Sequence, residues 1–244
     1  MAVLPFCMGR CFSALASGTE ARNGQAFALA FVAFFLGHSA PVRPPFRPIL
    51  VHLLGAAGFG LAYSALSVAI LTWLIVAAER APFLPVWNWM PWQSHLVLAI
   101  MLPVCLIAAL SIGRPNPFSF GGARNAAFDP ARPGIVRLAR HPLLVALALW
   151  SGAHLVANGD LAHILLFGTF FVFAIFGRRL VDRRKRREMG RSWDLLWERV
   201  LARPLGEELF RFSRETVLRA ALGVGLYMAL IMLHPIVIGV DPIP

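Results

Sequence analysis

The sequence has little charge and very little cysteine. Only 14% of its 244 residues are charged, whereas about a quarter of the residues in soluble domains are charged. Its three cysteines, Cys7, Cys11 and Cys105, form neither a C-x-x-C pair nor a C-x-x-C-H motif. This pattern excludes a disulfide framework, a zinc cage and covalently attached haem. The sequence also lacks a P-loop, a dinucleotide-binding fingerprint and any pattern resembling a soluble catalytic triad.

Apolar residues dominate instead. They make up 58% of the chain, with 19 phenylalanines and 7 tryptophans. A helix that crosses the hydrocarbon layer of a bilayer needs about 20 mainly apolar residues. Six segments meet or approach this requirement: 24–40, 56–78, 94–112, 135–157, 161–177 and 217–240. The sequence therefore predicts an all-α membrane protein, a polytopic helical bundle of about six transmembrane helices.

The basic residues predict how the chain crosses the membrane. Apart from Arg10, Arg22 and Arg80, they lie in the loops that follow the first, third and fifth segments. Because Lys and Arg near span ends favour the cytoplasmic side, these loops are expected to be cytoplasmic and both termini to lie on the opposite side. We expect a bacterial-type inner membrane. The net charge of +11 is confined to loops, which argues against nucleic acid as a partner.

Two segments remain open to more than one interpretation. Residues 1–22, interrupted by Arg10, form an uncertain N-terminal extension: an interfacial segment, a poor signal sequence or an over-long gene start. Residues 23–244 form the transmembrane domain. The basic run 178–191 is either an anionic-lipid or nucleotide site or a topology anchor on a solvated helix.

The seven histidines are the main candidates for a functional site. Ionisable residues at membrane depth are costly, and they face the bundle interior by default. Two facing imidazoles are the usual axial ligands of haem in helical bundles. His38 with His154, or His38 with His141, is a candidate pair. His38 lies near the inner end of its span, so depth alone favours His141.

Arg140, His141 and Pro142 are also candidates for a separate site. Proline suits the first turn of a helix, where free amides favour an anion. A phosphate, carboxylate or nucleotide site is one interpretation of this stretch. A capped helix start with Arg140 extended to the headgroups is the other.

Six motifs taken in order make the sequence similar to the NnrU family, from about residue 25 to the C-terminus. The motifs are Phe35-Leu36-Gly37-His38-Ser39, Asn116-Pro117-Phe118-Ser119, Phe128-Asp129-Pro130-Ala131-Arg132-Pro133-Gly134, Arg140-His141-Pro142, Trp150-Ser151-Gly152-Ala153-His154 and Asn158-Gly159-Asp160.

The resemblance implies a function in nitrite and nitric oxide metabolism, that is, in denitrification. The NnrU family is similar to 15-cis-zeta-carotene isomerase, an integral membrane haem b protein. This likeness implies non-covalent haem b with His38 and His154 as iron ligands. Ser151 stands where the isomerase has its switching cysteine, so a ligand switch is not expected here. The expected role is a redox or gas-responsive factor, with nitrogen-oxide reductase components as partners, or an isomerase-like enzyme.

A second likeness gives an alternative function. The motif Arg140-His141-Pro142, a helical hairpin and a following basic stretch resemble the isoprenylcysteine carboxyl methyltransferases. This likeness implies S-adenosylmethionine bound at Arg140 and His141. However, Leu143 and Leu144 stand where that group carries an aromatic residue. A non-catalytic assembly or regulatory protein is the third hypothesis.

Overall fold

The computed structural model describes residues 5–206 and 213–244, with side chains described from residue 18 onward. Within these ranges every regular element is a helix, and an isolated bridge joins Pro85 to Asp160. The predicted all-α membrane fold is confirmed. Four helices of the described part are long and apolar enough to cross a membrane: α2 (Phe46–Arg80), α3 (Pro91–Ser111), α6 (Leu161–Met189) and α9 (Arg214–Val237). The number of six spans stays a prediction.

The chain divides into two compact units, and each is described separately. Residues 1–87 and 160–166 form the first unit, and residues 88–159 and 167–244 form the second. The boundary proposed at residue 22 is not visible in the backbone, because α1 (Pro5–Ser39) runs through it as one helix. The division into an extension and a transmembrane domain therefore stays a prediction.

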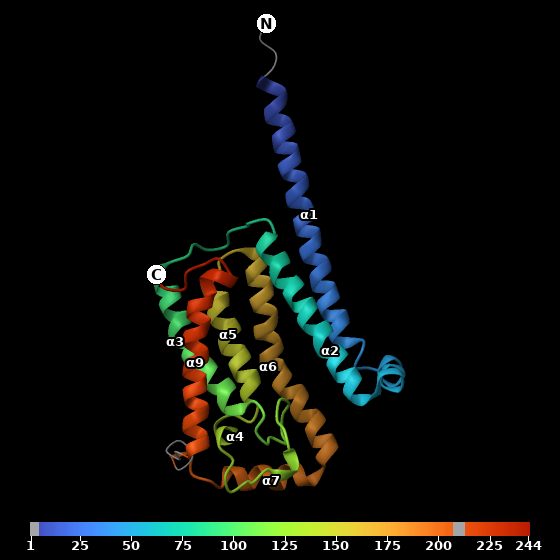
Figure 1. Ribbon diagram of the computed structural model, residues 1–244, viewed down its shortest axis with the longest axis vertical. Coiled ribbons are helices and arrows are strands. Elements are labelled where there is room, and N and C mark those ends of the chain that lie inside the picture. Colours follow the sequence, from blue (N-terminus) through green and yellow to red (C-terminus); the bar gives the residue numbers. More distant parts are fainter. Residues whose placement is uncertain (1–4, 207–212) are drawn as a thin grey trace. The chain divides into compact units, whose positions relative to one another are not determined.

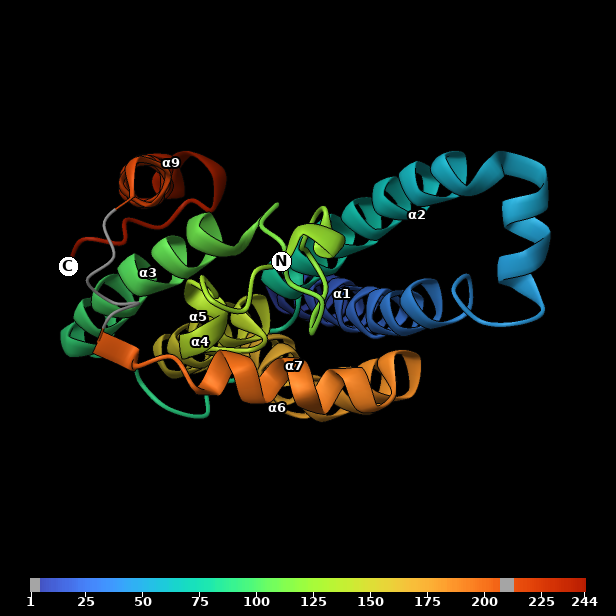
Figure 2. The same cartoon turned by 90° about the horizontal axis from the view of Figure 1, so that it is seen from below.

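In the first unit, α1 packs against α2. The Tyr63 hydroxyl of α2 donates a hydrogen bond to the backbone oxygen of His38 at 3.2 Å. Gly37 lies so close to Ile70 that a Cβ added there would be 2.4 Å from the isoleucine Cδ1. The helix α2 bends at Gly55, whose φ of 71° belongs to the left-handed region that glycine enters without steric cost. Figure 2 shows this bend, which coincides with the predicted start of the second span at residue 56.

In the second unit, α3 packs against both α9 and α5 (Pro142–Ala157) and lies between them (Figure 2). Small residues allow the close approach that helices need in a membrane, where there is no hydrophobic force between them. A Cβ on Gly223 of α9 would be 3.1 Å from the Cys105 backbone oxygen and from the Leu106 Cα. The Tyr227 hydroxyl of α9 donates to the Leu98 carbonyl of α3 at 3.1 Å.

The predicted fourth span, 135–157, is wrong at its beginning. A short helix, α4 (Ile135–Leu138), ends before Ala139, and α5 begins only at Pro142. Proline has no N–H to donate to the carbonyl four residues earlier, and its ring disfavours a helical conformation at the preceding residue. His141 therefore adopts a non-helical N-cap conformation, with φ −118° and ψ 69°.

The helix α6 continues beyond the predicted end of its span at residue 177. It carries the basic run as far as Met189, and α7 (Arg191–Leu201) follows after Gly190, whose φ is 58°. The amphipathic α7 runs across the end of the second unit (Figures 1 and 2) and buries Trp193 and Val200. The loop between α3 and α4 contains one short 3₁₀ helix, η1 (Asn125–Ala127). We call residues 112–141 and 178–201 the arginine-rich end.

Candidate functional site

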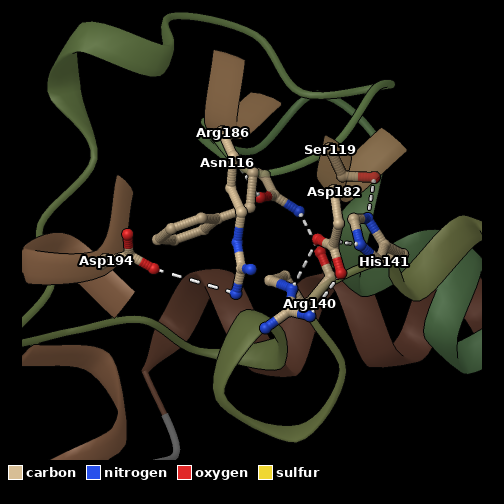
Figure 3. A network of polar contacts seen from close by, with 8 residues as sticks. Asn116, Ser119, Arg140, His141, Asp182, Arg186 and Asp194 are labelled. Carbon is tan, nitrogen blue, oxygen red and sulfur yellow. Dashed lines mark hydrogen bonds and ion pairs between the residues drawn. The ribbon is translucent and has the colours of Figure 1, made fainter. Parts of the chain in front are cut away.

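A network of polar side chains occupies the arginine-rich end, and Asp182 of α6 is at its centre (Figure 3). Asp182 Oδ1 accepts a hydrogen bond from Arg140 Nε at 2.9 Å, and its Oδ2 accepts one from Arg140 Nη2 at 2.5 Å. The two side chains are 21% and 23% exposed. Two parallel bonds from one guanidinium give both strength and a fixed geometry. The ion pair thus holds α6 against the start of α5.

His141 is bound on both sides of its ring. Its Nε2 lies 2.9 Å from Asp182 Oδ1, and its Nδ1 lies 3.0 Å from Ser119 Oγ. Because a carboxylate only accepts, Nε2 carries the proton, and Nδ1 then accepts from the serine hydroxyl. Burial lowers the pKa of His141 below its ordinary value, although the Asp182 carboxylate acts in the opposite direction. The imidazole is therefore neutral at pH 7.

Asn116 organises the loop that brings Ser119 to this network. Its Nδ2 donates to the Arg140 backbone oxygen at 3.1 Å, and its Oδ1 accepts from the Phe118 N–H at 3.1 Å. Its own N–H donates to Asn125 Oδ1 at 2.9 Å. The amide side chain thereby satisfies backbone groups that a buried loop would otherwise leave unpaired.

Aromatic side chains of α7 cover the Arg140 guanidinium. Its Cζ lies 4.9 Å from the Trp193 ring centre and 4.6 Å from that of Trp197. Arg186 lies over Trp193 at 4.2 Å, and its Nη2 is 3.8 Å from Asp194. Phe118 meets both tryptophan rings edge to face, with centroid distances of 5.7 and 5.3 Å. Guanidinium ions are attracted to aromatic faces, so α7 is held by Arg140 as well as by apolar packing.

The contacts of Ser119, His141 and Asp182 follow the order of a nucleophile, a base and an orienting acid. However, Ser119 and His141 are each 3% exposed, and Asp182 is already bound in bidentate fashion by Arg140. The arrangement therefore has a structural role: it joins the loop that carries Ser119 to the start of α5 and to α6. The positive charge expected to attract an anion at Arg140 is paired with Asp182.

The two histidines expected to bind haem lie in different units. His38 is next to the last residue of α1, and its Nδ1 is 2.9 Å from the Phe34 carbonyl oxygen. His154 lies in α5, with its Nδ1 2.9 Å from the Trp150 carbonyl oxygen. Aromatic rings flank both imidazoles: Phe34 lies 4.3 Å from His38, and Trp150 lies 5.3 Å from His154.

Ser151, which stands at the position of the isomerase's switching cysteine and was expected beside the cofactor, is fully buried in α5. Its hydroxyl donates to the Leu147 carbonyl at 2.6 Å, a bond within its own helix. Among the residues that the structure describes, no three His, Cys, Asp or Glu side chains form a metal-binding group. The cofactor-binding roles of Arg140, His141 and Ser151 stay predictions.

The comparison with known families agrees with the motifs. A family model described as NnrU protein matches residues 26–242, nearly the whole chain. The chain belongs to the NnrU family. No curated protein and no solved structure matches it. The family and the four long apolar helices identify a multi-pass membrane protein.

Sequence reasoning missed the partner that organises this end of the NnrU protein. Asp182 stands among arginines in the sequence, and its contact with Arg140 spans 42 positions. The available signal was that an acidic residue interrupts a basic run. Ser119 belongs to a recognised motif, but nothing in the sequence indicates that its hydroxyl faces His141.

The neutral His141 leads to a prediction for the stability of the NnrU protein. Because burial lowers the folded-state pKa, the unfolded chain binds a proton more readily, and stability falls as the pH drops below about 6.5. Replacing His141 with Gln removes this contribution. We expect thermal unfolding scans in detergent between pH 8 and 5 to show a shallower decline for His141→Gln than for the unmodified protein. Parallel slopes would contradict the assignment.

Proposed function

We propose that this NnrU protein binds haem b in the membrane, that His38 and His154 would hold its iron, and that the protein acts in nitrite and nitric oxide metabolism. The family membership supports the link to nitrogen oxides. The resemblance to a haem b protein supports the choice of ligands. When bound, haem supplies one-electron redox chemistry or a site for a diatomic gas.

The orientation of the two imidazoles carries the proposal. A carbonyl oxygen only accepts, so each Nδ1 carries the proton in its bond to the carbonyl four residues earlier. Each Nε2 then keeps its lone pair, which is the atom a metal needs. Histidines that bind metals almost always donate the other ring N–H to a carboxylate, carbonyl or water. Both histidine side chains are therefore suited to bind iron through Nε2.

The same argument favours His154 over His141 as the second ligand. In His141, Nε2 donates to Asp182 and Nδ1 accepts from Ser119. Both nitrogens are thus engaged, and binding iron would break one bond of a buried side chain. Among the residues that the structure describes, His154 forms its hydrogen bond through Nδ1, and its Nε2 has no bond to break.

The test is an absorption spectrum of the protein purified in detergent after expression with added haem. We expect a Soret band in the unmodified protein and its loss in the double variant His38→Ala/His154→Ala. His95→Ala is the matched control, because His95 Nδ1 makes the same bond to the carbonyl four residues earlier, at 2.9 Å. His95 lies near the start of α3 and has no assigned ligand role.

Four outcomes decide between the assignments. A Soret band that persists in the double variant contradicts the proposal, as does its absence from the unmodified protein when haem is supplied. Loss of the band in His141→Ala but not in His154→Ala would move the second ligand to His141. Loss of the Soret band in His95→Ala alone would show that neither His38 with His154 nor His38 with His141 binds the haem.

In the methyltransferase alternative, S-adenosylmethionine would bind at two residues that already have a partner within the protein. Arg140 and His141 are both bound by Asp182, and S-adenosylmethionine would have to displace that carboxylate. Calorimetric titration with this cofactor separates the two hypotheses. A non-catalytic assembly protein would bind neither cofactor, and it would co-purify with a reductase subunit from native membranes.

A further inference from the structure

An open pocket lies within the arginine-rich end, and the proposed function does not use it. Its volume is about 320 Å³, and it is formed by the loop after α3 together with the first turns of α9. The motif 128–134, which helps to identify the family, forms part of its wall. The charged side chains that line it are Arg114, Arg124, Arg132, Arg219, Asp129 and Glu215. Four guanidinium groups thus face two carboxylates.

Two of these arginines are used to hold the pocket together. Arg219 Nη1 donates to the Ala109 and Ile112 carbonyl oxygens at 3.1 and 2.9 Å. These bonds provide hydrogen-bond donors for backbone carbonyls at the C-terminal end of α3. Arg219 Nε donates to Glu215 at 2.9 Å, and Arg114 Nε lies 3.8 Å from the same carboxylate. Glu215 therefore balances the two structural cations.

Among the described residues, the other two arginines have only weak compensation for their positive charge. Arg132 is 74% exposed, and its Nε lies 3.9 Å from Asp129, a distance typical of a weak surface pair. The Asp129 carboxylate is itself engaged, because its Oδ1 accepts the Ala131 N–H at 2.9 Å. Arg124 is exposed and lines the same pocket, and among the pocket's carboxylates it acts on Glu215 only through charge, without a direct bond. These two guanidinium groups are available to a bound anion.

The pocket lies at the level where apolar helices end. The helix α3 stops at Ser111 and α9 starts at Arg214, and both are long and apolar enough to cross a membrane. In a bilayer, phosphate groups lie at this level. Beyond the pocket, α9 presents Leu218 and Leu222, each 62% exposed, to the space that acyl chains occupy. A ligand with a phosphate and attached apolar chains matches both surfaces.

We propose that this pocket binds the phosphate group of an anionic phospholipid through Arg124 and Arg132. The planar guanidinium matches the geometry of phosphate oxygens and donates two hydrogen bonds to them. Arg114 and Arg219 add positive charge from positions fixed by Glu215. The site is distinct from the basic run 178–191, for which the sequence also allowed a lipid role.

The test is titration of the full-length protein in dodecyl maltoside with dioctanoyl phosphatidylglycerol, followed by microscale thermophoresis. We expect Arg124→Gln/Arg132→Gln to weaken binding by about tenfold, since hydrogen bonds to charged groups are strong. The matched control, Arg43→Gln/Arg47→Gln, removes the same charge from exposed positions between α1 and the first turn of α2, and we expect binding within about twofold of the unmodified protein. Dioctanoyl phosphatidylcholine should bind much more weakly.

The other results would overturn the proposal. An equal loss in both double variants would show general charge attraction, and equal binding of phosphatidylcholine would show that the negative charge is not recognised. Competition by inorganic phosphate at the concentration of the lipid would assign the pocket to a soluble phosphate compound. If the double variant does not give a monodisperse protein, the single variant Arg132→Gln, at a 74% exposed position, provides the same comparison with Arg47→Gln, which is also exposed. None of these outcomes depends on haem.

Discussion

Replacing Asp182 with Asn is expected to lower the thermal unfolding midpoint by about 5–10 °C, the largest effect we predict for a single polar change. The substitution removes the negative charge but keeps the size of the side chain. Arg140, 23% exposed, is left without its counter-charge beneath two tryptophan rings. A charge that has lost its partner away from water is strongly destabilising. Because two of the seven tryptophans, Trp193 and Trp197, contact Arg140, part of the change in tryptophan fluorescence on unfolding comes from this site.

Asp194→Asn is the matched control for this experiment. Asp194 also faces an arginine, but the two atoms are 3.8 Å apart and both side chains are more than half exposed. Exposed pairs contribute little to stability, so we expect a shift below about 2 °C. Equal shifts in the two variants would contradict the central role of Asp182.

A double variant, Arg140→Gln/Asp182→Asn, tests the physical cause. If the loss comes from an unpaired cation, removing that cation recovers part of the stability. If it comes from disturbed packing of α7, the double variant is less stable than either single variant. The thermal unfolding midpoints of Arg140→Gln, Asp182→Asn, the double variant and the unmodified protein form a complete double-mutant cycle.

Replacing Gly223 with Leu is expected to lower the midpoint by about 4–10 °C, because overpacking a close helix contact is costly. A Cβ at this position would lie 3.1 Å from backbone atoms of Cys105 and Leu106. A backbone cannot move aside as the end of a flexible side chain can, so α9 must separate from α3. Gly225→Leu is the control, because a Cβ there would meet nothing within 4 Å.

Cysteine labelling provides a local measurement of the same separation. Cys105 is a free thiol in α3 and only 1% exposed. In a background with Cys7 and Cys11 changed to Ser, we expect maleimide to react faster with Cys105 in Gly223→Leu than in Gly225→Leu. Equal labelling rates, together with equal midpoints, would show that the contact at Gly223 does not hold the two helices together.

The helical architecture was predictable because bilayer thickness sets the length of apolar runs. The segment 94–112 corresponds closely to α3, and 217–240 lies largely within α9. The start of α5 was misplaced because hydropathy alone does not detect the break at Pro142. The same stretch was recognised as a helix start when the missing proline N–H was considered, so backbone hydrogen bonding was the more informative signal.

The polar contacts of the site were much less predictable. Arg140 and His141 were selected from the sequence, but their shared partner, Asp182, lies on another helix. Apolar patterning indicates which residues lie in the membrane, but not which of many arginines meets one carboxylate. The distances from Arg140 to the two tryptophans likewise depend on how α7 crosses the end of the bundle.

The position of Asp182 also fixes how α6 is set within the protein. It is the only acidic residue of this helix before Glu188, and its neighbours are Val181 and Arg183. Turning the helix by one residue, about 100°, would place a methyl group or a second cation against Arg140. At the other end, Asp160 accepts the His163 N–H at 3.2 Å and anchors the first turn. Asp182 therefore fixes both the rotation of α6 about its own axis and its position along that axis.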